Sequence, residues 1–105
     1  MANILSIGPD AKLLAARNRK LRQDGHHVRG ADTRATALAL AKSECFELIL
    51  LCHRFQPADT AQLVEELRTH APQAAILKLA GRTRPLTLSE IQSIIRNRAA
   101  NTLAA

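Results

Sequence analysis

The thiol of Cys52 is the side chain in this sequence that is best placed for a chemical role, because it directly follows a run of branched aliphatic residues, 48–51. His53 and Arg54 come next, and nearby cations lower the pKa of a thiol and favour its reactive thiolate form. One hypothesis is therefore a thiol-based redox sensor at Cys52. We favour the alternative of an inert buried cysteine, since an unreactive thiol packs like a small apolar residue. Cys45 forms neither a CxxC pair nor a zinc-knuckle pattern with Cys52, so both thiols are expected to be reduced.

The histidines do not predict a metal site. His26 and His27 are adjacent, so in a strand they point to opposite faces and cannot easily share one metal ion. His53 and His70 have no partner at a ligand spacing. The sequence also lacks a Ser-His-Asp set, a glycine-rich phosphate loop and a nucleotide fingerprint. We therefore expect no enzymatic activity, no metal and no cofactor.

The chain is basic, with 15 Lys and Arg against 9 Asp and Glu, a net charge of +6. Cations concentrate in the first predicted helix, at Lys12, Arg17, Arg19, Lys20 and Arg22. Such a helix is interpreted first as having a solvated face. The alternative is a phosphate-binding face, which would make the protein a nucleic-acid-associated transcriptional regulator. No helix-turn-helix, zinc-finger or aromatic RNA-stacking signature supports that alternative.

The elements that must position these residues alternate along the chain. Its 105 residues fit one domain, placed at residues 1–98, with 99–105 as a frayed tail. Apolar runs predict buried strands at 4–7, 47–51 and 74–79, and a short edge strand at 26–31. Helical spacing and capping residues predict helices at 10–23, at 33–43, from 59 to before Pro72, and from the capping box at 87–90 to about 96. This order demands an α/β fold with a doubly wound parallel sheet.

The framework resembles the receiver domain of bacterial response regulators, a flavodoxin-like fold, over nearly the whole chain. The segments that carry the resemblance are ILSI at 4–7, DGHHV at 24–28, TALAL at 36–40, FELILL at 46–51, RFQP at 54–57 and RPL at 84–86. The resemblance implies that 46–57 is similar to the strand and loop that carry the family's phosphorylation site. It also implies that 84–86 is similar to the family's Lys-Pro-Phe turn.

The residues that the family's chemistry requires are replaced in this sequence. A receiver needs two adjacent carboxylates for Mg²⁺, a phosphoacceptor Asp, a Thr or Ser, and a Lys, because phosphoryl transfer depends on the cation and on positioned positive charge. The matching positions hold Gly8 and Pro9 for the acidic pair, Cys52 for the acceptor, Leu79 for the hydroxyl and Arg84 for the Lys. Asp10 lies one residue beyond the positions that match the acidic pair, and we interpret it as a helix N-terminal acid. The resemblance therefore implies a receiver fold with a degenerate phosphorylation pocket.

A second departure from the family is length. Only Arg82 and Thr83 separate Gly81 from Arg84, where a full receiver has a fourth helix and a fifth strand, together about 15 to 20 residues. Their loss would leave the strand at 74–79 as an exposed edge, with Ala75, Ile76, Leu77, Lys78 and Leu79 as a dimer edge. We therefore expect a homodimer, formed through this edge or through an exchanged last helix hinged at 81–85.

These observations predict a receiver-like domain that acts without phosphorylation, through protein contacts, in a bacterial two-component or related regulatory pathway. The expected partners are a signalling protein and a second copy of the chain, with nucleic acid as the alternative. No run approaches the roughly 20 apolar residues of a membrane span, and the chain does not start with a secretory signal pattern, so a cytoplasmic location without membrane contact is expected.

Overall fold

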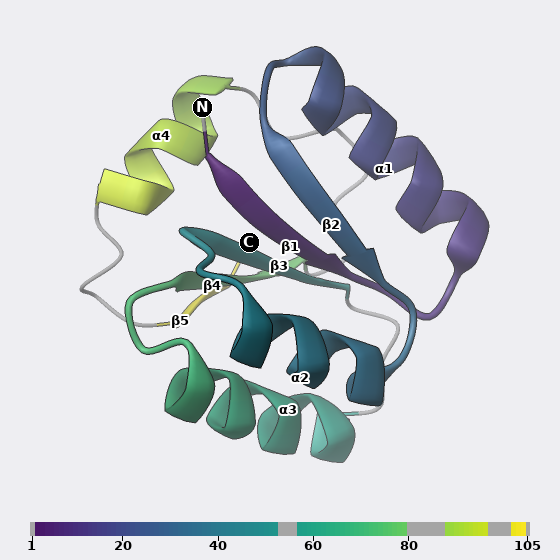
Figure 1. The fold of residues 1–105 in the computed structure, drawn as a ribbon, viewed down its shortest axis with the longest axis vertical. Helices are drawn as coiled ribbons and strands as arrows, with labels where there is room; N and C mark the ends of the chain where they lie inside the picture. The colour runs from purple at the N-terminus through teal and green to yellow at the C-terminus, as the bar shows by residue number, and fades with distance from the viewer. Residues whose placement is uncertain (1, 53–56, 80–87, 97–101, 105) are drawn as a thin grey trace.

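The chain forms a parallel β-sheet with helices on both faces (Figure 1). The structure, a computed structural model, describes residues 2–52, 57–79, 88–96 and 102–104. The strands are β1 (Asn3–Ile7), β2 (His27–Ala31), β3 (Leu48–Cys52), β4 (Ala75–Leu79) and β5 (Thr102–Ala104). The helices are α1 (Ala11–Gln23), α2 (Arg34–Ser43), α3 (Pro57–His70) and α4 (Leu88–Arg96). The sheet order is β2-β1-β3-β4-β5, which confirms the predicted doubly wound α/β fold.

The central strand β3 is buried on both faces. Its residues Leu48, Ile49, Leu50 and Leu51 are all 0% exposed. β1 pairs with β3 on one side through Ile4 and Leu48, and β4 pairs on the other through Leu48 and Ala75. A strand in this position needs apolar side chains on both faces, which explains why its sequence does not alternate.

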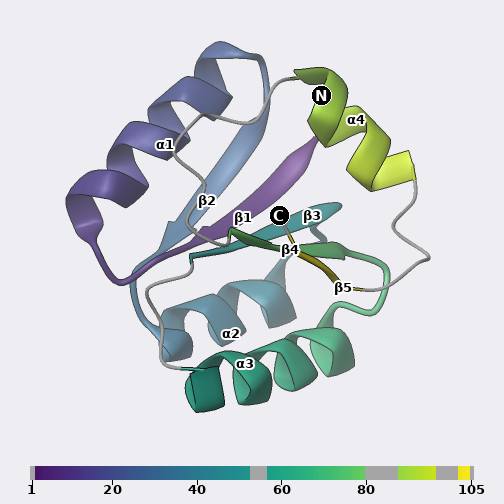
Figure 2. The same cartoon turned by 180° about the vertical axis from the view of Figure 1, so that it is seen from behind.

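Two separate cores lie on the two faces of the sheet. Helices α2 and α3 cover one face, where Phe46 and Leu67 are almost fully buried. Helices α1 and α4 cover the opposite face, where Leu21 and Ile91 pack onto the strands (Figure 2). Phe46 is the largest fully buried side chain among the described residues. Because aromatic residues are scarce, aliphatic side chains make up most of both cores.

Local sequence signals explain most helix boundaries. Thr33 caps α2, because its side chain accepts from the N–H of Thr36 at 3.2 Å. Gly25 follows α1 with a φ of 93°, a conformation that favours glycine. The predicted start of the third helix at Asp59 is wrong, because α3 begins at Pro57. Proline is tolerated in the first helical turn, where its missing N–H is not needed. The capping box predicted for the last helix includes Thr87, which lies outside the described residues.

The predicted frayed tail at 99–105 is corrected by the structure, because it contains a strand. β5 pairs in parallel with β4, with Ile76 beside Thr102 and Lys78 beside Ala104. The strand Ala75–Leu79 is therefore not the exposed edge that the sequence predicted. The physical reason is general: an unpaired row of N–H and C=O groups is stabilised by any segment that can reach it in register.

The described helices and the last strand bear differently on the predicted shortening of the fold. Among the described residues, α2 and α3 are the helices that contribute to the core on their face. The predicted loss of a fourth helix concerns the segment at 80–87, which lies outside the described residues. The last helix lies on the same face of the sheet as α1, where Ile91 is in the core and Ile94 and Ile95 pack against it. The fifth strand was expected to be missing, yet a segment that follows the last helix fills that place in the sheet.

The connection through α4 has the opposite hand to the other three crossovers. The chain passes from β1 to β2 through α1 toward one edge, and from β4 to β5 through α4 toward the other edge, with both helices on the same face. The connections through α2 and α3 also run toward the β5 edge, but these two helices lie on the other face of the sheet. Since about 98% of such crossovers are right-handed, the β4-α4-β5 connection is the unusual one.

Candidate functional site

The strand register brings the candidate site together at the carboxyl edge of the sheet. Ile7 pairs with Leu51, so Gly8 and Cys52 follow at the ends of β1 and β3. Cys52 is in register with Leu79 at the end of β4. The ends of neighbouring parallel strands meet at one edge, which is where open α/β sheets bind their ligands. Gly8, Cys52 and Leu79 therefore occupy the ends of three adjacent strands.

The position of the acidic pair offers no carboxylate. Gly8 is buried, and its N–H donates to the carbonyl of Ala31 at 3.0 Å. Pro9 is exposed and carries no polar side-chain atom. Asp10 is the N-cap of α1, and its Oδ1 accepts from the N–H groups of Lys12 at 3.0 Å and Leu13 at 3.2 Å. The carboxylate thus satisfies amides that the helix start leaves without partners, as the interpretation of Asp10 as a helix N-terminal acid requires.

The position that the resemblance assigns to the phosphate-binding hydroxyl is apolar and buried. Leu79 is 7% exposed and belongs to the core on the α1 and α4 face, together with Leu50, Leu77 and Ile91. The backbone of Cys52 is described but its thiol is not, so the choice between a reactive and an inert thiol stays a prediction. The cations expected near this edge, at His53, Arg54 and Arg84, lie outside the described residues.

A described cation that bonds to β1 near this end of the sheet is Arg17, which the sequence analysis placed on a possible basic surface. Its Nε donates to Ser6 Oγ at 3.0 Å, and its Nη2 donates to the carbonyl of Ile7 at 3.2 Å. Ser6 is 0% exposed, so its hydroxyl needs a partner within the protein. Arg17 supplies that partner, so this member of the predicted basic surface is partly buried and its guanidinium is directed toward the sheet. Two signals pointed to this contact: a serine inside a buried strand, and an arginine spaced with Leu14 and Leu21 along the helix.

The same interface of α1 with the sheet holds a second buried polar side chain. Asn18 is 5% exposed, and its Oδ1 has no hydrogen-bond partner among the described residues. It packs against β2 at Gly30, where an added Cβ would lie 2.7 Å from Asn18 Nδ2. Gly30 therefore lets α1 approach the strand closely with a polar side chain between them.

The other cations of α1 have different surroundings. Arg22 Nη2 donates to the carbonyl of Val28 at 3.0 Å, and Lys20 Nζ lies 3.3 Å from Asp24 Oδ1. Lys12 and Arg19 are exposed. Of the predicted basic surface, Arg17 and Arg22 donate hydrogen bonds to groups of the strands, although Arg22 remains exposed. These contacts reduce the charge available for phosphate contacts.

His26 is a buried histidine that joins two distant parts of the chain. It is 5% exposed, and its Nδ1 accepts from the N–H of Ala2 at 3.2 Å. Its Nε2 has no partner among the described residues. Burial lowers the pKa of His26 from its ordinary value, against the smaller opposing influence of Asp24 and Glu47. The neutral ring is therefore the form that fits the fold.

We expect the stability of the protein to fall as the pH drops below about 6.5, the ordinary pKa of histidine. In that range the unfolded chain binds a proton at His26 that the folded chain resists, so the proton favours unfolding. The His26→Asn variant keeps an acceptor but cannot titrate. Urea unfolding measured from about pH 7.5 down to about pH 5 should show a steeper fall in the free energy of unfolding for the parent than for His26→Asn. The exposed neighbour provides the control, because His27→Asn should follow the parent. Equal slopes for the parent and His26→Asn would contradict the assignment.

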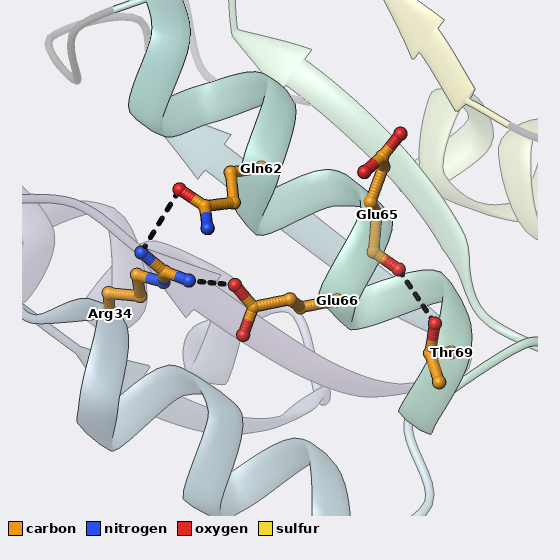
Figure 3. Close-up of polar contacts among 5 residues, drawn as sticks. All are labelled: Arg34, Gln62, Glu65, Glu66 and Thr69. Atoms are coloured by element: carbon orange, nitrogen blue, oxygen red, sulfur yellow. Dashed lines mark hydrogen bonds and ion pairs between the residues drawn. The ribbon is translucent and has the colours of Figure 1, made fainter.

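A polar contact fixes α2 against α3 on the opposite face of the sheet (Figure 3). Arg34 at the start of α2 forms an ion pair with Glu66 and donates to Gln62 Oε1 at 3.4 Å. Within α3, Thr69 Oγ1 donates to the carbonyl of Glu65 at 3.0 Å. The ion pair is partly exposed, so it orients the two helices more than it stabilises the fold.

Other classes of site find no support in the part of the chain that the structure describes. Among those residues there is no group of three or more His, Cys, Asp or Glu side chains able to hold a metal ion. No helix within them has both the length and the apolar character needed to cross a membrane.

The sheet order and the alternation of strands and helices define the fold of a response-regulator receiver domain, which confirms the predicted resemblance. No protein-family model matches the sequence, and no curated protein matches it. The chain is similar to a response regulator protein from Burkholderia pseudomallei, with a TM-score of 0.72 and 28% identity over 99% of this chain and 59% of that chain.

Two further solved structures show the same fold. A response regulator receiver domain protein from Methanospirillum hungatei has a TM-score of 0.72 and 21% identity, over 99% of this chain and 80% of that one. A chemotaxis response regulator of Vibrio cholerae gives a TM-score of 0.72 and 21% identity, over 99% of this chain and 84% of that one. The fold extends over nearly all of this chain in each comparison.

Proposed function

We propose that this chain is a receiver-like signalling domain that works without phosphorylation, in the cytoplasm, through contacts with a protein of a two-component or related pathway and with a second copy of itself. The observation that carries the proposal is the type of residue found at the carboxyl edge of the sheet. There Gly8, Cys52 and Leu79 end three adjacent strands, and none of them is a carboxylate or a hydroxyl.

The lack of oxygen ligands on the side chains of Gly8, Pro9 and Cys52 supports this proposal. Magnesium prefers hard oxygen ligands, and the nearest acid in sequence, Asp10, is bonded to the first amides of α1. The Burkholderia pseudomallei structure, by its description, contains a phosphorylated aspartic acid and a calcium ion. In this chain the matching acceptor position holds Cys52, and a thiol cannot form an acyl phosphate.

The proposal is tested by incubating the protein with acetyl phosphate and Mg²⁺ and recording the intact mass. We expect no mass increase corresponding to a phosphoryl group, and no change in the amide spectrum of the domain. The matched comparison is the Gly8→Asp, Pro9→Asp, Cys52→Asp variant, which returns carboxylates to the three positions. A stable phosphoryl adduct on the parent chain, under conditions that also label a phosphorylatable receiver, would overturn the proposal.

A further inference from the structure

The last strand of the sheet is attached in a way that is unfavourable within one chain. β5 makes only a short ladder with β4, from Ile76 beside Thr102 to Lys78 beside Ala104. The connection that delivers it passes through α4, on the same face as α1, and has the opposite hand to the other three crossovers. That hand is rare, because the twist of the strands and helices disfavours it.

We infer that the place of β5 is an interaction site for the C-terminal strand of a second copy of this chain. In such a dimer, residues 102–104 of each copy pair with Ala75–Leu79 of the other. The same backbone groups of β4 are satisfied in either arrangement, so the ladder itself is unchanged. The handedness constraint applies only to a crossover within one chain, and it disappears when the strand comes from the partner.

Two further features favour exchange. The connection between Arg96 and Thr102 is short in sequence, and short hinge connections favour the swapping of terminal elements. The rest of the domain does not depend on the exchange, because α4 is held on its own copy by Ile91, which is 0% exposed. The result is a two-fold dimer in which each edge receives the partner's strand, a low-cost route to association.

The inference specifies the proposed contact with a second copy and does not depend on the phosphorylation state. The first measurement is sedimentation of the unmodified protein from low to high micromolar concentration, where a dimer is expected. A monomer throughout that range would overturn the inference, while leaving the acetyl phosphate result unaffected.

The second measurement asks which strand lies beside β4. Two single variants, Lys78→Cys and Ala104→Cys, are made in a background carrying Cys45→Ser and Cys52→Ala, mixed, and treated with a short bismaleimide. Exchange predicts a cross-linked heterodimer, because residues 78 and 104 are register partners. The matched control replaces Ala104→Cys with Arg19→Cys, an exposed position on α1, and should give no specific product.

A cross-link confined to single chains in the Lys78→Cys, Ala104→Cys double variant, with no heterodimer in the mixture, would overturn the inference. A heterodimer formed equally well with the Arg19→Cys control would also overturn it. Because sedimentation uses the unmodified protein, the inference stays testable even if a cysteine variant fails to fold.

Discussion

Replacing Leu79 by threonine lowers the free energy of unfolding by about 2 to 4 kcal/mol. The substitution restores the hydroxyl that a receiver carries at this position, but it does so inside an apolar core. Leu79 is 7% exposed and packs with Leu50 and Ile91. The loss combines the transfer energy of the removed methyl groups, the space that they leave and the desolvation of a hydroxyl. Urea unfolding monitored by circular dichroism measures it.

The control for this prediction is Leu79→Met, which keeps the volume and the apolar character. We expect it to cost less than about 1.5 kcal/mol. If Leu79→Thr were as stable as the parent, the end of β4 would tolerate a polar group. That result would weaken the proposal that this chain has lost the phosphorylation pocket. The expected result means that a single substitution cannot restore the pocket without cost to the fold.

Replacing Arg17 by alanine is expected to cost about 1 to 3 kcal/mol, because it removes hydrogen bonds that a charged group donates to buried acceptors. Ser6 Oγ and the Ile7 carbonyl both lose this donor. Arg19→Ala is the matched control on the same helix. Arg19 is exposed, so its removal should change stability by no more than about 0.5 kcal/mol.

A double variant separates the buried bond from the general effect of charge. In Ser6→Ala, Arg17→Met the buried hydroxyl and its donor are removed together, and replacing both partners by apolar groups can be nearly neutral. We therefore expect the double variant to be more stable than the sum of the losses in Ser6→Ala and Arg17→Met predicts. Additive losses from the two sites would contradict the direct contact, since coupled neighbours deviate from additivity.

The structure also changes how the basic composition is interpreted. A helix with cations at 12, 17, 19, 20 and 22 looks like a continuous basic surface in the sequence. In three dimensions Arg17 and Arg22 bond to strand groups, and Lys20 pairs with Asp24. A count of charges cannot distinguish these roles, because the stem of a long side chain lets its charged group reach a distant partner.

The sequence by itself determined the core architecture. The uninterrupted apolar residues of β3 predicted a strand buried on both faces, and the alternation of strands and helices predicted the parallel sheet. Capping residues such as Asp10 and Thr33 predicted helix starts to within a residue. These features depend on side chains close together in sequence, where periodicity and hydrogen-bonding capacity are direct evidence. The degenerate phosphorylation pocket is a prediction from the receiver resemblance, and the register of the sheet places Cys52 beside Leu79 at the ends of neighbouring strands.

Only the tertiary structure decided where the C-terminal segment and Arg17 lie. Residues 102–104 carry little strand signal of their own, and they form β5 because β4 presents an edge with unpaired backbone groups. Arg17 turns toward the sheet because a buried hydroxyl and a strand carbonyl lie within its reach. Both outcomes depend on groups that are far apart in sequence and come together only when the sheet has formed, so no local pattern could have determined them.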